Sequence, residues 1–256
     1  MTFDRLLERV SAGEALEAGE LTELAAAHDI LSLGILGDAT RRRLHGTQTT
    51  YVRVARCAHD RSFVDAVPAA AGEIRITGAP DTLTEAVAVT EAARTVAGSR
   101  TVSGFSWADV KRLAFNAGTT SFHVLAPLRA SGLDSLAELA LDTVTDINAA
   151  VDELSRAGFQ QLRLTVEKAP AIERTPLLLQ ASALQRRHGS IHTINPLPTV
   201  VSPLQPTTGY DDVKAVAIAR DYLRETGIEA ICLPAFIDVT IDNEDRTAIR
   251  LVVEPR

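Results

Sequence analysis

Charged side chains recur at alternate positions in three strand-like runs, and their types suit the binding of a small anion. Arg53 stands in the run YVRVA, Glu73 and Arg75 in EIRIT, and Arg163 and Glu167 in LRLTVE. Guanidinium groups donate paired hydrogen bonds to carboxylates and phosphates. On one shared face, these residues would line a slightly positive interior able to hold such an anion. The alternative is that the charges only neutralise one another inside a filled core.

Several candidate residues stand where strands are expected to end. Ligands of α/β barrels bind at the carboxyl ends of the strands. Glu167 and His192 are the candidate catalytic residues, because a carboxyl group or an imidazole can transfer protons. The candidate ligand-binding residues are Arg53, Arg163, Asp134 and Asn195. A purely structural, hydrogen-bonded His192 remains the alternative. No metal site is predicted, since Cys57 and His59 have no identifiable third ligand.

The elements that must position these residues alternate along the chain. Runs rich in β-branched residues predict strands near 51–55, 73–78, 101–105, 133–136, 161–166, 190–195 and 229–236. Amphipathic segments predict helices at 81–98, 146–158, 175–189 and 211–227, which open on Asp or Thr and close on Gly. Strand and helix in alternation predict a parallel sheet.

The predicted fold class is α/β, as a TIM-type (β/α) barrel, complete or distorted, with N-terminal helices and a C-terminal β-hairpin. The expected single domain divides into a helical extension at 1–48, the barrel at 49–236 and the hairpin at 237–256. One polar face on each strand favours a barrel with a polar interior. A doubly wound open sheet is the alternative, although its internal strands are normally apolar on both faces.

The net charge and the cysteine content exclude several classes of function. The formal charge of −7 provides no electrostatic footprint for nucleic acid or an anionic membrane. The two cysteines form no disulfide framework or zinc ribbon, and the charged N-terminal segment is unlike a signal peptide. We therefore expect a cytoplasmic protein with neither a nucleic-acid nor a membrane partner.

Three segments together carry a family resemblance. They are TRRRLHGTQTTYV at 40–52, FSWADVKRLAFNAGTTSFHVLAPLRASGLDSL at 105–136 and TTGYDDVKAVAIARDYL at 207–223. In this order they resemble the radical S-adenosylmethionine enzymes of the menaquinone (futalosine) and deazaflavin pathways, the group of aminofutalosine synthase, dehypoxanthine futalosine cyclase and FO synthase. The resemblance is diffuse over the rest of the chain up to about residue 223, and it implies a TIM-type barrel. An unrelated barrel of similar helix composition is the alternative.

The chain departs from this family where the family binds its cofactors. After TYV the family has a Cys-x3-Cys-x2-Cys loop that holds a 4Fe–4S cluster, whereas this chain has only Cys57 before Glu73. One thiolate cannot hold such a cluster. Of the family's two glycines for the methionine moiety only Gly78 remains, and helix-forming residues 137–140 replace a glycine-rich turn. We therefore predict no cofactor, with loss of both the 4Fe–4S cluster and S-adenosylmethionine binding.

These departures predict a cluster-less, radical S-adenosylmethionine-like pseudoenzyme linked to menaquinone or futalosine-type metabolism. It would act as a partner, regulator or metabolite-binding protein. The expected partners are an active radical S-adenosylmethionine paralogue, a second copy of itself as an oligomer, or a small-molecule metabolite. The main alternative is a cluster-free enzyme acting on a small anionic or nucleoside metabolite in the barrel mouth. A weaker alternative is an iron–sulfur protein with ligands from another chain.

Overall fold

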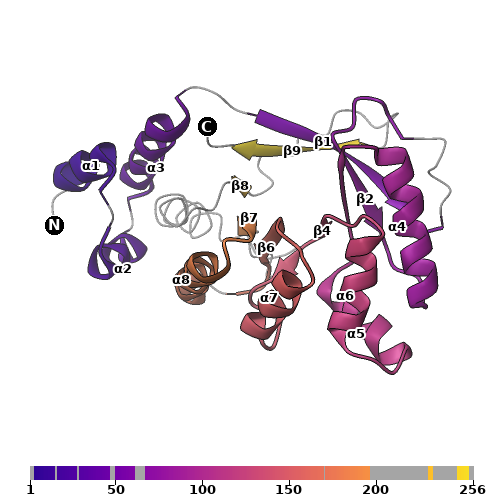
Figure 1. Ribbon diagram of the computed structural model, residues 1–256. Helices are drawn as coiled ribbons and strands as arrows, with labels where there is room; N and C mark the ends of the chain where they lie inside the picture. Colours follow the sequence, from indigo (N-terminus) through magenta and orange to yellow (C-terminus); the bar gives the residue numbers. More distant parts are fainter. Residues whose placement is uncertain are drawn as a thin grey trace, which may run out of the picture.

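The N-terminal segment forms three helices (Figure 1), which have a small apolar core of their own. The computed structural model describes residues 3–14, 16–27, 29–46, 50–60, 67–169, 171–196, 230–232 and 247–253. The helices are α1 (Phe3–Ala12), α2 (Ala18–Ala26) and α3 (Ile30–His45). Their leucines and Val10 pack together, and Leu179 from the later helix α8 (Ala171–His188) packs against this cluster. The N-terminal helices expected from the sequence are therefore present.

The rest of the described chain alternates strands and helices. The strands are β1 (Thr50–Ala58), β2 (Glu73–Thr77), β3 (Thr101–Gly104), β4 (Ser135–Leu136), β5 (Leu139–Ala140), β6 (Leu162–Val166), β7 (Ile191–Pro196), β8 (Ala230–Cys232) and β9 (Thr247–Val253). Between them lie α4 (Leu83–Ala97), α5 (Trp107–Asn116), α6 (Ser121–Ala130), α7 (Ile147–Arg156) and α8. The strands run in the order β4-β3-β2-β1-β9-β8-β7-β6-β5.

This sheet curls so that its two edge strands come near each other. The edge strands β4 and β5 are separated in the chain only by Ala137 and Glu138. A guanidinium nitrogen of Arg163 on β6 also lies 2.8 Å from a carboxylate oxygen of Glu73 on β2. In a flat sheet of this order these strands would be about 24 Å apart, at about 4.8 Å per strand. Only a curled sheet brings the two side chains together.

The α/β fold with a parallel sheet is confirmed, but full closure is not shown. Among the described strands, β4 pairs with β3 and β5 with β6, and no pairing joins β4 to β5. The sheet also departs from an all-parallel barrel, because β9 runs antiparallel between β1 and β8. The strand β9 lies where the second arm of the expected C-terminal hairpin was predicted, but it pairs with β1 and β8. The first arm of that hairpin and the expected helix at 211–227 lie outside the described residues.

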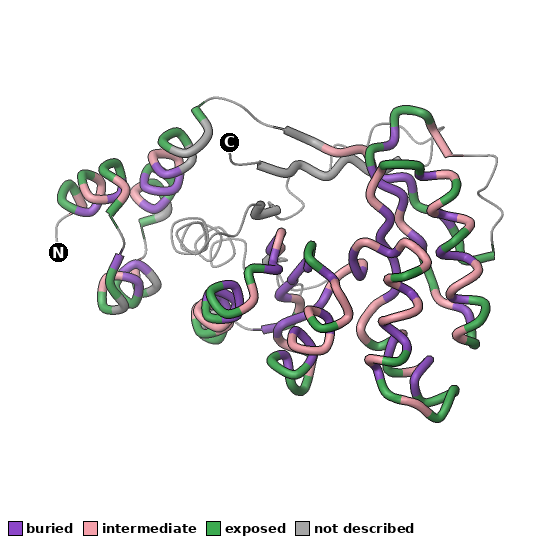
Figure 2. Tube along the Cα trace, in the orientation of Figure 1, coloured by how far each residue is buried: buried purple, intermediate pink, exposed green. Residues whose placement is uncertain are grey.

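The apolar face of the curled sheet meets the helices. Ile74, Ile76, Val102 and Leu164 are almost fully buried in one core with residues of α4 to α8. In Figure 2 the buried residues follow the strands and the sides of the helices that face them. The interior face of the sheet is therefore the opposite one, which carries Glu73 and Arg163.

Two expectations about local structure are corrected. The register pairs Ala55 with Ile74 and Cys57 with Ile76, so Arg53 shares their apolar, helix-facing side and not the face of Glu73. The predicted polar face of the first strand was out of phase by one residue. Residues 137–140, expected to be helix-forming, instead run between and into the short strands β4 and β5. There the backbone N–H of Ala137 donates to the carbonyl oxygen of Gly104, and hydrogen bonding to β3 outweighs helix propensity.

Gly104 is a position where the sheet leaves no room for a side chain. A Cβ atom there would lie 2.7 Å from the Cβ atom of Ile76 on the neighbouring strand. We expect Gly104→Ala to lower the free energy of unfolding by about 1–3 kcal/mol, measured by urea unfolding. The matched control is Gly34→Ala in α3, where nothing lies within 4 Å and alanine favours the helix. A stable Gly104→Ala protein would contradict the close approach of β2 and β3.

None of the helices in the described part of the chain is both long and apolar enough to cross a membrane.

Candidate functional site

A cleft opens at the carboxyl ends of β3, β5 and β6, where ligands bind in barrels of this kind. Its volume is about 430 Å³. We call it the carboxyl-edge cleft; it is lined by Ser106, Trp107, Ala108, Lys111, Glu138, Ala140, Thr143, Val144, Thr145, Asp146, Ala149, Ala150, Glu153 and Glu167. This volume falls in the range of small-molecule sites, about 300–1,000 Å³.

Two helices begin at this cleft, and each start is fixed by a cap. Ser106 accepts from the backbone N–H of Asp109 at 3.1 Å, and Asp109 accepts from the backbone N–H of Ser106 at 2.8 Å. The Asp146 carboxylate accepts from the backbone N–H of Ala149 at 3.0 Å at the start of α7. These caps fix the first turns of α5 and α7; Trp107 lines the cleft from the first turn of α5, and Glu153 lines it from the second turn of α7.

The backbone leading into α5 is held in an uncommon conformation. Phe105, between β3 and the cap, has a φ of +56° and is almost fully buried. A bulky residue rarely adopts this left-handed region, and such residues concentrate at functional sites where surrounding packing holds them. The carbonyl oxygen of Phe105 accepts from the backbone N–H of Ala137 at 3.0 Å, which ties the turn to the strand segment at the sheet edge.

Glu167 is positioned by Asp142. The Asp142 carboxylate accepts from the backbone N–H groups of Glu167 at 3.1 Å and of Ala169 at 2.7 Å, and from that of Lys168. Burial raises the pKa of Asp142, but these backbone donors outweigh it and lower the pKa. Arg174 donates from Nε to the carbonyl oxygen of Ala169 at 3.0 Å and holds the same loop.

The pKa of Glu167 is shifted in the opposite direction. Burial raises the pKa of its carboxyl group, and the nearby charges of Asp142 and Glu138 raise it further, against a small lowering effect of Lys168. A carboxyl group with a raised pKa can hold a proton closer to neutral pH and act as a general acid or base. Lys111, with its ammonium 5.1 Å from the centre of the Trp107 ring, is the cation among the carboxylates of the cleft.

Beneath the cleft, a charged network fills the amino end of the sheet interior. Glu73 accepts from Ser103 Oγ at 2.7 Å, from Arg75 at 3.1 Å and from both terminal nitrogens of Arg163. Burial by itself raises the pKa of Glu73, but the hydrogen bonds and charge of Arg163, with the charge of Arg75, bring it down to about 2. The network joins strands on opposite sides of the interior.

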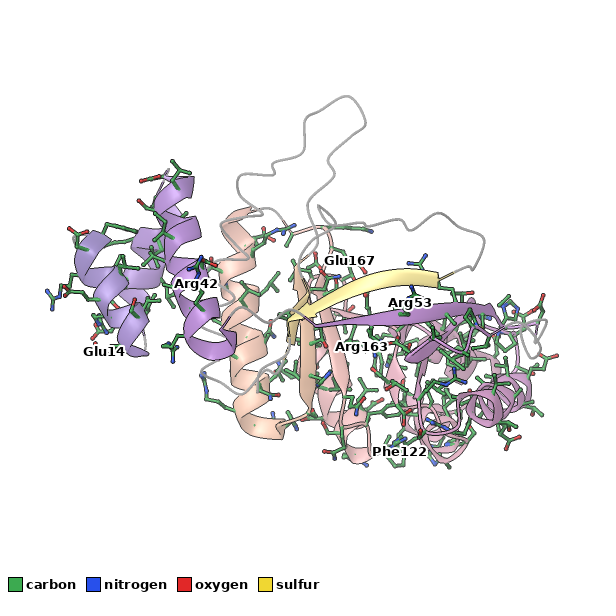
Figure 3. The ribbon with its side chains drawn as sticks, turned by 90° about the horizontal axis from the view of Figure 1, so that it is seen from above. Glu14, Arg42, Arg53, Phe122, Arg163 and Glu167 are labelled. Atoms are coloured by element: carbon green, nitrogen blue, oxygen red, sulfur yellow. The ribbon has the colours of Figure 1, made fainter. Side chains whose placement is uncertain are left out.

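The structure brings some of the predicted site residues together and separates others (Figure 3). Arg163 and Asn195 share the interior face, because the register pairs Arg163 with Thr193 and Thr165 with Asn195. Glu167 follows the same strand into the cleft. His192 falls at the bulge in that register, alternate to Thr193, so its side is not that of Asn195. Whether any of them binds or reacts stays a prediction.

Arg53 and Asp134 do not join this group, and the expected convergence is corrected for both. Figure 3 shows Arg53 on β1 beside β9, and the register places it on the outer face. Asp134 precedes β4, at the amino end of the sheet, where it pairs with Arg94 and accepts from Arg129 at 3.2 Å. The predicted strand at 133–136 was too short to show where it begins. In the structure Asp134 comes directly before β4 and not after it.

Other residues of the site were missed from the sequence. Asp142, Lys111, Glu138 and Glu153 gave no recognisable spacing, since they come from a loop, two helices and the link between β4 and β5. The predicted helix start at Asp146 was the one available signal. Among the described residues no group of three His, Cys, Asp or Glu side chains could hold a metal ion. Cys57 is buried, and burial raises its pKa to about 11, which disfavours the thiolate that binds metals.

Parts of this chain are similar to known proteins. The family model for Stage V sporulation protein S (SpoVS) matches residues 207–256, less than half of the chain and largely outside its described part. The X-ray structure of the FeFe-hydrogenase maturase HydG from Carboxydothermus hydrogenoformans is similar with a TM-score of 0.60 and 14% identity, over 88% of this chain. An enolase from the environmental genome shotgun sequencing of the Sargasso Sea has a TM-score of 0.42 and 12% identity over 90% of this chain and 64% of its own.

The chain spans 64% of the length of HydG. At 14% identity the likeness concerns the fold alone. It supports the fold class predicted from the sequence: the chain has an α/β fold similar to that of HydG.

Proposed function

We propose that this protein binds a small-molecule metabolite in the carboxyl-edge cleft and performs no radical chemistry of its own. The observation that carries the proposal is the cleft itself, at the carboxyl ends of β3, β5 and β6, with an aromatic ring and several charged groups around it. The cysteine count supports the second part, since the chain has only two cysteines where a cluster of the family's type needs three.

We further propose that the metabolite belongs to menaquinone or futalosine-type metabolism, with the curled sheet serving as a distorted TIM-type barrel. This step rests on the sequence resemblance. A nucleoside has a flat base that can stack on an aromatic ring, and Trp107 offers such a ring at the cleft. Hydroxyl and amine groups of the same molecule could bond to Glu138, Glu153 or Glu167. Binding would let the protein act as a regulator or partner of an active paralogue.

The test is a thermal-shift and native mass spectrometry screen of anaerobically purified protein against S-adenosylmethionine and futalosine-type nucleosides, with iron assayed in parallel. A ligand that binds the folded state raises the melting temperature. We expect a nucleoside of the pathway to bind and S-adenosylmethionine not to bind. Iron at cluster stoichiometry, or no binding of any pathway nucleoside, would contradict the proposal. The same mass spectra give the oligomeric state.

Trp107→Ala is expected to weaken nucleoside binding about tenfold or more, because base stacking contributes about 1–3 kcal/mol. The matched control is Phe115→Ala on the same helix, whose ring is 86% exposed and does not line the cleft. Both affinities are measured by isothermal titration calorimetry. Equal affinities for the two variants would place the ligand elsewhere.

A cluster-free enzyme is the second candidate, favoured by the raised pKa of Glu167 in the cleft. In that case the carboxyl group would transfer a proton to or from the bound metabolite. Conversion of the bound metabolite during long incubation, followed by mass spectrometry, separates an enzyme from a binding protein.

A further inference from the structure

Three buried polar atoms on one face of the sheet interior have no hydrogen-bond partner among the described residues. They are Nε of Arg163, Oγ1 of Thr165 and Oδ1 of Asn195. Arg163 is 7% exposed and Thr165 is fully buried. A buried polar atom that forms no hydrogen bond costs about 1–3 kcal/mol, so three such atoms at one place indicate a bound group that satisfies them.

The strand register places these atoms next to one another. Thr165 is the register partner of Asn195, so the two side chains stand on adjacent strands about 4.8 Å apart. Arg163 lies two residues before Thr165 on the same face, about 7 Å along the strand. The two terminal nitrogens of Arg163 already bond to Glu73, whereas Nε is the guanidinium nitrogen that has no hydrogen-bond partner.

The donors of this region favour an anion. Arg163 carries a positive charge, and its Nε–H has no acceptor among the described residues. An unpartnered donor on a charged group that is 7% exposed is costly unless an anion or a further hydrogen-bond acceptor joins it. The Thr165 hydroxyl can donate to the same acceptor, and the Asn195 amide can present its NH₂ group by a half-turn of its side chain.

We propose that the sheet interior binds a small oxyanion, either a carboxylate group or a phosphate, between Arg163, Thr165 and Asn195. This site goes beyond the proposed function, because it lies below the carboxyl-edge cleft and involves none of the residues that line it. Ala140, the register partner of Thr165 on β5, does line the cleft. The proposed site therefore adjoins the cleft at Ala140.

The test compares melting temperatures of the full chain in sodium acetate, sodium phosphate and sodium chloride at equal ionic strength, each up to about ten times the apparent Kd. We expect one or both oxyanions to raise the melting temperature saturably by about 3 °C or more, while chloride does not. A larger response to acetate assigns the site to a carboxylate, and a larger response to phosphate assigns it to phosphate. No saturable response to either would overturn the proposal.

Thr165→Val separates this site from anion binding elsewhere. Because valine has the same shape without the hydroxyl, we expect the apparent Kd for the oxyanion to rise about tenfold. Without anion, the variant should melt at the wild-type temperature or higher, since it removes a buried hydroxyl with no partner. A response equal to that of the wild type, or an anion-free melting temperature several degrees lower, would show that the hydroxyl serves another role.

The matched control is Thr90→Val. Thr90 is equally buried, but its hydroxyl donates to the carbonyl oxygen of Ala86 at 2.8 Å within α4. It should leave the oxyanion response unchanged. If Trp107→Ala loses nucleoside binding but keeps the oxyanion response, the two ligands bind at separate sites. The cleft proposal and the oxyanion proposal can therefore fail independently of each other.

Discussion

Replacing Glu73 with glutamine is expected to lower the free energy of unfolding by about 3–5 kcal/mol. Glutamine keeps the shape of the side chain but removes the charge that Arg163 and Arg75 both contact. Arg163 is 7% exposed, so its charge cannot be solvated by water after the change. Urea unfolding followed by circular dichroism measures the loss.

Two further variants decide whether the cause is the buried pair. Glu73→Leu combined with Arg163→Met removes both charges and should recover most of the lost stability, because apolar pairs often replace buried ion pairs at little cost. Asp38→Asn breaks an exposed pair with Arg42 in α3 and should cost about 0.5 kcal/mol or less. A Glu73→Gln protein as stable as the wild type would mean that the carboxylate does not neutralise the arginines.

Acid is expected to destabilise the protein through the same carboxyl group. The pKa of Glu73 is about 2 in the folded protein against an ordinary value of 4.5. A lowered pKa means that the folded state favours the ionised form. The corresponding stability is fully present above about pH 5 and is lost as the pH falls toward 2. The shift corresponds to about 3 kcal/mol at neutral pH.

The measurement is the free energy of unfolding from urea titrations at several pH values between 7 and the acid limit of folding. Glu73→Leu with Arg163→Met is the control, since it keeps every other carboxyl group. Its stability should fall less on acidification, by up to about 3 kcal/mol. Glu167 works in the opposite direction, because its raised pKa favours the protonated form in the folded state. Parallel pH profiles for the two proteins would rule out Glu73 as the acid-sensitive group.

The strand β6 connects the buried charged network to the carboxyl-edge cleft. Arg163, Thr165 and Glu167 follow one another at alternate positions of β6 and just beyond it, from the buried network to the rim of the cleft. Alternate residues of a strand share a face, so the sequence LRLTVE was sufficient to predict that these three lie together. What it did not show is that the strand is buried on both faces, with Thr165 fully enclosed.

Helices were predicted correctly where capping residues mark their ends. The helices at 83–97 and 147–156 begin at side-chain caps, and α4 ends at a glycine with positive φ. The secondary structure of segment 135–140 was not predictable from local propensity. Its residues favour a helix, but pairing with β3 and β6 holds them in an extended conformation. Its partners lie tens of residues away in the chain, and local propensity contains no information about them.

The sequence by itself determined the class of fold and the succession of strands and helices along the chain. It also showed one cysteine where a cluster would need three. Periodicity, capping and the number of possible ligands can all be read directly from the sequence. The tertiary structure decided which face each strand turns inward. A shift of one residue on β1 moved Arg53 to the outer side, and the direction of the chain at β4 moved Asp134 to the far end of the sheet. It also decided that Lys111, Glu138 and Glu167 meet at the cleft, with Asp142 holding the backbone of Glu167, because packing of the strands and helices brings these segments together.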